Sequence, residues 1–292
     1  MTGAHLKIAI LGATGQLGGA MLAAAARRHD AVGFVRRDVD VTDDAALARV
    51  LKAARPDCVI NCAAFSAVDA AEDAPVEAMA VNALAPRALA RIAADLDATL
   101  VHYGTDFVFD GTATGPNTED RAPHPSGVYA TSKLIGEWFA AETPRHYVLR
   151  VESLFGGAVP KSSVDGLLDG ILKGREVTAF SDRTVSPSFV VDVAEATLTT
   201  LERRIPYGLY HCVNSGQTTW DELARELARL AGRPDAAIAT KRMADLTMRV
   251  RRPLNAALSN AKLAAAGIEM PTWQDALARH VHARMLRHET RT

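Results

Sequence analysis

The apolar positions of this chain form short continuous runs that alternate with longer stretches of helical periodicity. Runs of strand length fall at residues 7–11, 31–35, 58–63, 99–103 and 147–151. Strands without a polar face are typical of sheets that are covered on both sides. Helical stretches separate these runs, at residues 19–28, up to 54, 75–95 and from 129 onward. This alternation predicts right-handed crossovers and a parallel doubly wound sheet, which is an α/β fold.

The pattern becomes less regular after about residue 150. Helices are expected at residues 165–173, 191–203, 219–231 and from 272, and a strand at 207–213. Thr219 and Glu222 form a capping-box pattern, and Thr42 or Asp43 is expected to cap the helix that ends at residue 54. We therefore predict a Rossmann domain over residues 1–150. Residues 151–292 should form mainly a smaller C-terminal lobe, with some segments returning to the Rossmann domain.

A glycine-rich turn joins the first strand to the first helix. Gly12, Gly15 and Gly18 follow the strand with the spacing Gly-x-x-Gly-x-x-Gly. Glycines let the backbone approach a pyrophosphate, and the free N–H groups at a helix N-terminus receive its charge. Because strand, turn and helix follow one another here, we expect dinucleotide binding. The residues expected to form this binding loop are Gly12, Thr14, Gly15, Gln16, Leu17 and Gly18.

The end of the second strand bears on the choice of cofactor. An acidic residue there would bind the adenosine ribose of NADH, whereas this chain has Arg36 and Arg37. Planar guanidinium groups suit a 2′-phosphate, so NADPH is favoured, with NADH possible. The alternative is that both arginines are simply solvated. Ala63 and Ala64, at the end of the third strand, are small enough to let a cofactor lie across the sheet edge.

Tyr129 and Lys133 are the candidates for acid–base chemistry. They stand four residues apart at the start of a helix, so they lie on one face. A nearby ammonium favours the phenolate, and lowering a tyrosine pKa by about three units needs roughly 4 kcal/mol. This spacing also occurs on ordinary solvated helices. Thr105 adds a hydroxyl at the carboxyl end of the fourth strand, where open α/β sheets hold ligands.

Composition excludes several classes of function. The 292 residues are 48% hydrophobic and 23% charged with a net charge of -1, so no basic excess suggests nucleic acid. The apolar runs are too short to span a membrane, and no signal-peptide pattern precedes the first strand, so a cytoplasmic protein is expected. Three cysteines are too few for a disulfide framework. The histidines show no metal-ligand spacing, and His280 and His282 are expected to be solvated.

These motifs resemble those of an extended short-chain dehydrogenase/reductase, and specifically the dTDP-4-dehydrorhamnose reductase family. Residues 12–18 are similar to its Gly-Ala-Thr/Asn-Gly-Gln-Leu-Gly loop. Residues 105–111, Thr-Asp-Phe-Val-Phe-Asp-Gly, are close to its Thr-Asp-Tyr-Val-Phe-Asp-Gly run, the most family-specific segment. Further similar segments lie at residues 40–43, 61–72, 81–83, 251–253 and 271–273.

The resemblance implies hydride transfer from NADPH to the C4 ketone of a nucleotide-linked 4-keto-6-deoxyhexose. Tyr129 would donate the proton, while Lys133 would bind the nicotinamide ribose and lower the Tyr129 pKa. Thr105 would hydrogen-bond the substrate oxygen, and Asp106 would support the site. The lobe after residue 150 would hold the nucleotide sugar, and a homodimer is among the expected assemblies. Expected contacts also include Asp40 and Val41 for the cofactor, and Ser153 and Arg252 for the substrate.

Two departures from the family pattern lie on the substrate side. Glu152 and Ser153 stand where the family commonly has Ser-Trp, so Ser153 replaces an aromatic wall and Glu152 adds a possible negative charge. Residues 185–187 read Val-Ser-Pro where the family usually has Gly-x-Pro-Thr. The reaction type is therefore better defined than the sugar.

Two alternatives remain open on the same scaffold. A nucleotide-sugar epimerase would retain NAD and use the same Tyr129 and Lys133, but Arg36 and Arg37 disfavour it because an internal redox cycle needs no phosphorylated cofactor. A non-catalytic NADP-binding regulatory subunit is disfavoured by the intact set of Thr105, Tyr129 and Lys133.

Overall fold

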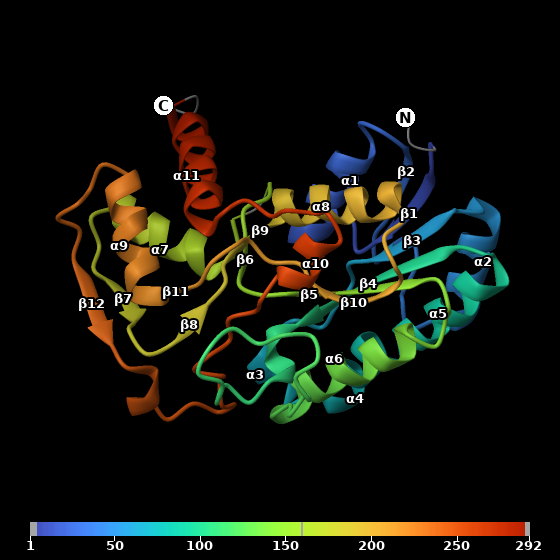
Figure 1. Ribbon diagram of the computed structural model, residues 1–292, viewed down its shortest axis with the longest axis horizontal. Helices are drawn as coiled ribbons and strands as arrows, with labels where there is room; N and C mark the ends of the chain where they lie inside the picture. The colour runs from blue at the N-terminus through green and yellow to red at the C-terminus, as the bar shows by residue number, and fades with distance from the viewer. Residues whose placement is uncertain (1–4, 159, 290–292) are drawn as a thin grey trace.

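The computed structural model describes residues 5–158 and 160–289. Its larger part is built on a six-stranded sheet with the order β10-β5-β4-β3-β1-β2 (Figure 1). Every neighbouring pair in this sheet is parallel, which confirms the predicted α/β class and the parallel doubly wound sheet. The strands are β1 (Lys7–Leu11), β2 (Asp30–Phe34), β3 (Cys58–Asn61), β4 (Thr99–Thr105), β5 (His146–Val151) and β10 (Gly208–His211).

Helices cover both faces of this sheet, and successive residues of β1 show the alternation. Ile8 and Ile10 pack with α1 (Gln16–Ala25), α8 (Val190–Arg203) and α10 (Ala261–Ala265). Ala9 and Leu11 pack on the other face with α2 (Asp44–Ala54), α5 (Ala85–Asp95) and the end of α6 (Gly127–Ala140). A strand buried on both faces needs apolar residues at every position, which explains its unbroken run.

The predicted helix caps are present. The Asp43 carboxylate accepts a hydrogen bond from the backbone N–H of Ala46 and so caps α2. Thr219 and Glu222 form the expected capping box at the start of α9 (Trp220–Leu230). Each cap satisfies N–H groups that have no partner inside the helix, and so sets where the helix begins.

The stretch predicted as one helix over residues 75–95 is interrupted by a π-helical turn. It consists of α4 (Pro75–Met79), the turn Ala80–Leu84, and α5. Asn82 lies in this turn, where its side-chain oxygen accepts from Phe65 N at 2.8 Å and its amide nitrogen donates to Ser132 Oγ at 3.0 Å. The turn therefore ties the chain after β3 to α6, a use typical of π-turns near functional sites.

A smaller lobe with its own core follows β5. Its helices are α7 (Ser163–Leu172), α9 and α11 (Trp273–Glu289), around a core that includes Leu168, Trp220 and Leu277. The sequence did not predict its strands, because pairs of two to four residues give no periodic signal. They are β6 (Leu154–Phe155) with β9 (Ser188–Phe189), β7 (Val177–Phe180) with β12 (Ile238–Lys241), and β8 (Thr184–Val185) with β11 (Thr218–Thr219).

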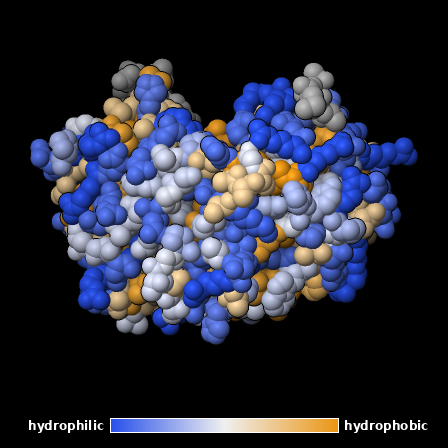
Figure 2. Space-filling view, viewed as in Figure 1, coloured by the Kyte–Doolittle hydropathy of each residue, from blue (hydrophilic) through white to orange (hydrophobic). Residues whose placement is uncertain are grey.

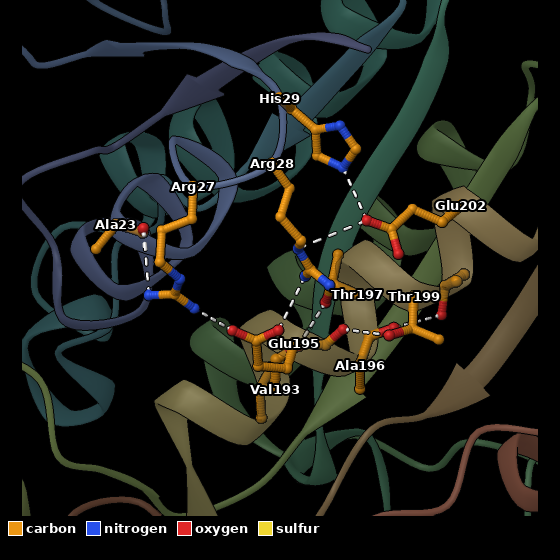
Figure 3. A network of polar contacts seen from close by, with 11 residues as sticks. Ala23, Arg27, Arg28, His29, Val193, Glu195, Ala196, Thr197, Thr199 and Glu202 are labelled. Atoms are coloured by element: carbon orange, nitrogen blue, oxygen red, sulfur yellow. Dashed lines mark hydrogen bonds and ion pairs between the residues drawn. The ribbon is translucent and has the colours of Figure 1, made fainter. Parts of the chain in front are cut away.

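Three elements from beyond residue 150, α8, β10 and α10, lie with the large sheet. The division of the chain into domains stays a prediction. A network of polar contacts joins α8 to the end of α1 (Figure 3). Arg28 Nη2 lies 2.9 Å from Glu195 Oε2, and His29 Nε2 lies 3.0 Å from Glu202 Oε1. Arg27 also pairs with Glu195. These contacts supplement the apolar packing between the two helices.

His280 corrects one expectation. It was predicted to be solvated, yet its side chain on α11 is buried with Nε2 3.1 Å from Asp165 Oδ1 on α7. The prediction failed because the periodicity of one helix does not reveal which neighbour covers each of its faces. His282, by contrast, is exposed as expected.

In the view of Figure 2 most of the surface is hydrophilic, and the outline is indented between α11 and the sheet-containing part. None of the helices described here is long and apolar enough to cross a membrane.

Candidate active site

The glycine turn is shaped by two close backbone contacts. Gly12 has φ +73°, and a Cβ added there would lie 2.8 Å from Ala63 N. A Cβ on Gly18 would lie 2.1 Å from the carbonyl oxygen of Gly12. Only glycine fits either position without displacing backbone. No side chain caps α1 at Gly15, so its first N–H groups are available to an anion, as dinucleotide binding requires.

A cavity of about 460 Å³, here called the cofactor groove, lies beside this turn. It is bordered by the glycine turn, by the chain after β2 and by the chain after β3, as expected at the carboxyl edge of a parallel sheet. Its size lies within the usual range of ligand pockets, about 300–1,000 Å³. The predicted cofactor residues that line it are Gly12, Thr14, Gly15, Arg36, Asp40, Val41, Ala63 and Ala64.

Other predicted cofactor residues do not line the groove. Gln16 turns away and donates from Nε2 to the Gly156 carbonyl at 2.9 Å, while Leu17 is buried beneath the turn. Gly18 serves the close packing of α1 on the turn. Arg37 has an 89% exposed side chain, with Nε 3.6 Å from Asp38 Oδ1. The Arg36 side chain is almost equally exposed, at 84%, but of the two arginines only Arg36 borders the groove.

Asp40 is the acidic side chain nearest Arg36 in the groove. Its Oδ1 accepts hydrogen bonds from Thr42 N at 2.9 Å and from Thr42 Oγ1 at 2.7 Å. These bonds hold the pKa of Asp40 below its usual value, and Arg36 adds to the effect. The other carboxylate oxygen, Oδ2, lies 3.8 Å from Arg36 Nε, so the two side chains form an ion pair at the edge of the groove.

The sequence missed part of the groove wall. Cys62 and Phe65 follow β3, and Glu77, Ala80 and Val81 come from α4 and the π-turn. The motifs gave no signal for them, because their position depends on how the helical stretch packs against the sheet. They close the side of the groove that faces the start of α6.

Tyr129 lies near the start of α6, which two contacts hold in place. Glu72, just after α3 (Val68–Ala71), accepts from Val128 N at 2.7 Å, and Ser132 Oγ donates to the Tyr129 carbonyl at 2.8 Å. The Phe107 ring meets the Tyr129 ring edge-on, with centroids 5.5 Å apart. The phenol is thus positioned from both its backbone and its ring.

Burial raises the pKa of Tyr129 to about 12. A hydrogen bond with the Thr105 side chain opposes this rise, while the charges of Asp106 and Glu137 add to it. Thr105 also donates from Oγ1 to Asp106 Oδ1 at 3.0 Å. Thr105, Asp106 and Tyr129 therefore form one connected group, in which the phenol keeps its proton at neutral pH.

Lys133 is buried one turn further along α6, and its Nζ donates to the Tyr103 carbonyl at 2.6 Å. Burial lowers the pKa of Lys133 to about 8, and the charge of Glu137 opposes that fall. The sequence predicted that this ammonium would lower the Tyr129 pKa. The structure shows the opposite shift, because burial of the phenol outweighs the opposing hydrogen bond and Lys133 is directed toward the Tyr103 carbonyl.

A buried ion pair next to Lys133 was not predicted. Arg150 on β5 donates from Nη2 to Glu137 Oε2 at 2.8 Å and from Nε to both carboxylate oxygens at 3.1 Å. Both side chains are nearly fully buried. The pair fixes a carboxylate one helical turn from Lys133, which supports the charged form of the lysine.

Two further residues predicted to bind the substrate, Arg252 and Ser153, lie outside the group formed by Thr105, Asp106 and Tyr129. The Arg252 guanidinium lies 5.9 Å from the Phe107 ring centroid, and its Nη2 donates to Asp69 Oδ2 at 2.6 Å. Ser153 follows β5 and lines a second cavity together with Asp106. The structure therefore brings Thr105, Asp106 and Tyr129 together. The Phe107 ring lies between Arg252 and Tyr129, and Ser153 shares the second cavity with Asp106.

Comparisons with known proteins agree with this geometry. The family described as RmlD substrate binding domain matches residues 6–285. The chain is 35% identical over 286 residues to a dTDP-4-dehydrorhamnose reductase of Mycobacterium tuberculosis, covering 95% of this chain and 93% of that one. It is also similar to the crystal structure of a dTDP-4-dehydrorhamnose reductase from Clostridium acetobutylicum, with a TM-score of 0.90 and 28% identity over 95% of this chain and 99% of that one.

A further solved structure carries a cofactor. The dTDP-4-dehydrorhamnose reductase of Bacillus anthracis in complex with NADP matches with a TM-score of 0.89 and 27% identity. The match covers 95% of this chain and 99% of that one. The likeness therefore extends over both the sheet and the smaller lobe.

Proposed function

This chain belongs to the RmlD substrate-binding-domain family of dTDP-4-dehydrorhamnose reductases, and we propose that it uses NADPH to reduce the C4 ketone of a nucleotide-linked 4-keto-6-deoxyhexose. The family makes it an NAD(P)-dependent oxidoreductase that acts on a nucleotide sugar. The observation that carries the finer proposal is the position of Tyr129 at the start of α6, against Phe107 and beside Thr105 at the carboxyl end of β4.

The residues divide the chemistry between them. NADPH, when bound along the groove, supplies the hydride. Tyr129 donates its proton to the oxygen that becomes an alkoxide, a role suited to a phenol whose pKa of about 12 keeps it protonated. Thr105 would hydrogen-bond the same substrate oxygen by turning to it the hydroxyl proton that it donates to Asp106 at 3.0 Å in the structure. Lys133 contributes an ammonium for the nicotinamide ribose.

The glycine turn and Arg36 support the choice of cofactor. The close contacts at Gly12 and Gly18 leave backbone exposed to a pyrophosphate, and Arg36 stands on the groove wall where a 2′-phosphate would be bound. The similar reductase from Bacillus anthracis is in complex with NADP. NADPH is therefore the proposed cofactor, while NADH stays possible.

The remaining assignments are proposals of the same kind. Arg252 is proposed to bind the substrate diphosphate, since its guanidinium already lies against Phe107 beside Tyr129. A substrate-binding role for the lobe after residue 150, a cytoplasmic location and a homodimer also stay proposals.

Two alternatives make different predictions. An epimerase would hold NAD tightly through its internal redox cycle, whereas Arg36 at the groove favours a phosphorylated cofactor that exchanges. A regulatory subunit would need no proton donor, whereas the Tyr129 phenol lies beside the Thr105 hydroxyl and interacts with it.

The test is to follow NADPH absorbance while the protein is mixed with a panel of nucleotide-linked 4-ketosugars. We expect stoichiometric NADPH oxidation with at least one 4-keto-6-deoxyhexose, and purified protein without bound NAD. Retained NAD together with sugar epimerisation would favour the epimerase. Cofactor binding without any turnover would favour the regulatory subunit.

A further inference from the structure

A second cavity, here called the polar cavity, lies between the end of the large sheet and the smaller lobe. Its volume is about 210 Å³. Asp106 and Phe107 reach it from the end of β4, Glu152 and Ser153 from the end of β5, and Arg183 from the lobe. Asp106 joins this cavity to the candidate active site, because its Oδ1 accepts the hydrogen bond from the Thr105 hydroxyl.

Buried polar atoms around this cavity lack partners. Asp106 is 3% exposed, and among the described residues nothing hydrogen-bonds its Oδ2. Arg183 Nε is likewise buried without a partner in the part of the chain that the structure describes. Leaving a buried polar atom unpaired is unfavourable, so an acceptor and a donor are both left to be satisfied. A ligand group that both donates and accepts a hydrogen bond would satisfy them.

Glu152 completes the polar wall, and each of its two carboxylate oxygens accepts a hydrogen bond. It is 2% exposed, its Oε2 accepts from Ser186 N at 2.5 Å, and its other oxygen accepts from the Ser153 hydroxyl. Burial, with the charge of Asp106 adding to it, raises the pKa of Glu152 to about 8, and burial raises the pKa of Asp106 to about 6. The cavity wall thus holds two carboxyl groups together with the Arg183 guanidinium, a lining that offers both acceptors and donors to a neutral hydroxyl and disfavours an anion.

Ser153 leaves this cavity open. It has φ +41°, in the left-handed region that few residues other than glycine adopt, and its short side chain is turned to Glu152. Strained backbone of this kind persists where the surrounding structure holds it, commonly at ligand sites. A large aromatic side chain at this position would need the space that the cavity occupies.

We propose that the polar cavity binds a ring hydroxyl of the substrate sugar, with Asp106 Oδ2 as the acceptor and the Arg183 guanidinium as the donor. This inference rests on the proposed function and narrows its substrate to ketosugars that keep that hydroxyl. Glu152 and Ser153 act as positioning residues, because they shape the wall and engage each other. The cavity therefore selects the sugar, while Thr105 and Tyr129 act on its ketone.

The test uses substrates that differ by one hydroxyl. The specificity constant kcat/KM is measured with dTDP-4-dehydrorhamnose and with its 2-deoxy and 3-deoxy analogues. A site built to hydrogen-bond a hydroxyl rejects the analogue that lacks it. We expect at least one analogue to lose about 100-fold or more, and Arg183→Met to reduce that preference at least tenfold. Arg175→Met, a change at an exposed position outside the cavity, is the matched control and should keep the preference.

Calorimetric binding of dTDP-rhamnose and its 2-deoxy and 3-deoxy analogues keeps the two proposals separable. If no ketosugar is reduced, the proposed function fails, but a preference for the hydroxylated ligand that Arg183→Met removes still supports the polar cavity. The inference is overturned if both deoxy analogues bind and react within about threefold of the parent compound. It is equally overturned if Arg183→Met and Arg175→Met show the same preference as the unaltered protein.

Discussion

Of the two candidate acid–base residues on α6, Lys133 rather than Tyr129 has a pKa near the neutral range. Burial lowers the pKa of Lys133 to about 8, so the ammonium is present below that pH and is lost above it. Burial raises the pKa of Tyr129 to about 12, so the proton donor stays protonated throughout this range. The alkaline limit of activity should therefore belong to the lysine.

We predict that kcat/KM for ketone reduction falls as the pH rises through about 8, since this quantity reports the pKa values of the free enzyme. In Lys133→Met the residual activity should lose this step, whereas Glu152→Gln, which removes the other group with a pKa of about 8, should keep it. The measurement is a pH profile of NADPH oxidation in the unaltered protein and in the two variants. An unchanged step near pH 8 in Lys133→Met would assign it to another group.

The two arginines after β2 should contribute unequally. Arg36 borders the cofactor groove, whereas the Arg37 side chain is directed to solvent beside Asp38. Hydrogen bonds to charged groups contribute about 1.5–3 kcal/mol. Arg36→Ala should thus weaken NADPH binding by about tenfold to 100-fold and leave NADH binding nearly unchanged. Arg37→Ala is the matched control, and fluorescence titration with both cofactors compares them; equal losses in the two variants would contradict the distinction.

Glu152 should make stability depend on pH. Its pKa is about 8 when folded against about 4.5 for an exposed glutamate, so the folded state binds more protons between these values. The free energy of unfolding therefore falls as the pH rises through that window, because a buried carboxylate near Asp106 must ionise.

Glu152→Gln removes this ionisation and can keep an oxygen toward Ser186 N. We expect a Tm at least about 2 °C above that of the unaltered protein at pH 8.5, corresponding to about 1 kcal/mol in a chain of this size, and a much smaller difference at pH 4.5. Thermal melts at the two pH values make the comparison. A difference that is the same at both would mean that Glu152 does not titrate in this range.

At the scale of elements, the start of α1 depends on Gly18. A Cβ there would lie 2.1 Å from a backbone oxygen, which cannot move without shifting the glycine turn, whereas a Cβ on neighbouring Gly19 would lie at an ordinary 3.5 Å from the Ala13 carbonyl. The two glycines therefore form a matched pair on one helix.

Gly18→Ala should destabilise the fold by about 1–3 kcal/mol, the usual cost of overpacking, and weaken NADPH binding because the turn is displaced. Gly19→Ala should be neutral or stabilise by up to about 1 kcal/mol through helix propensity. Chemical denaturation and cofactor titration measure both effects. Comparable behaviour of the two variants would mean that the close contact at Gly18 is not limiting.

Elements that carry their own local signal could be predicted from the sequence. The unbroken apolar runs of β1 and β3, the glycine turn and the Asp43 cap are each determined by neighbouring residues. The π-turn at Ala80–Leu84 gave no such signal, since Asn82 adopts it through contacts with Phe65 and Ser132 from distant segments. The burial of His280 against Asp165 has the same cause.

At the scale of the whole molecule, the site depends on how β4, β5 and α6 meet. Motifs could predict Thr105, Tyr129 and Lys133, because their spacing and place at the strand ends are local properties. The direction of the Tyr129 pKa shift could not be predicted, since it depends on burial by the assembled fold. The Glu137–Arg150 pair and the polar cavity also arise only when distant segments are brought together.

The most direct test of the proposed reaction uses NADPH labelled with deuterium at the transferred position, in a single turnover with a nucleotide-linked 4-keto-6-deoxyhexose. We predict that deuterium appears at C4 of the product sugar, and that Tyr129→Phe lowers the rate by about 100-fold or more while NADPH binding is nearly unchanged, the scale of lost general acid catalysis. Product without deuterium at C4, or an undiminished rate in Tyr129→Phe, would contradict the assignment of Tyr129 as the proton donor in this reduction.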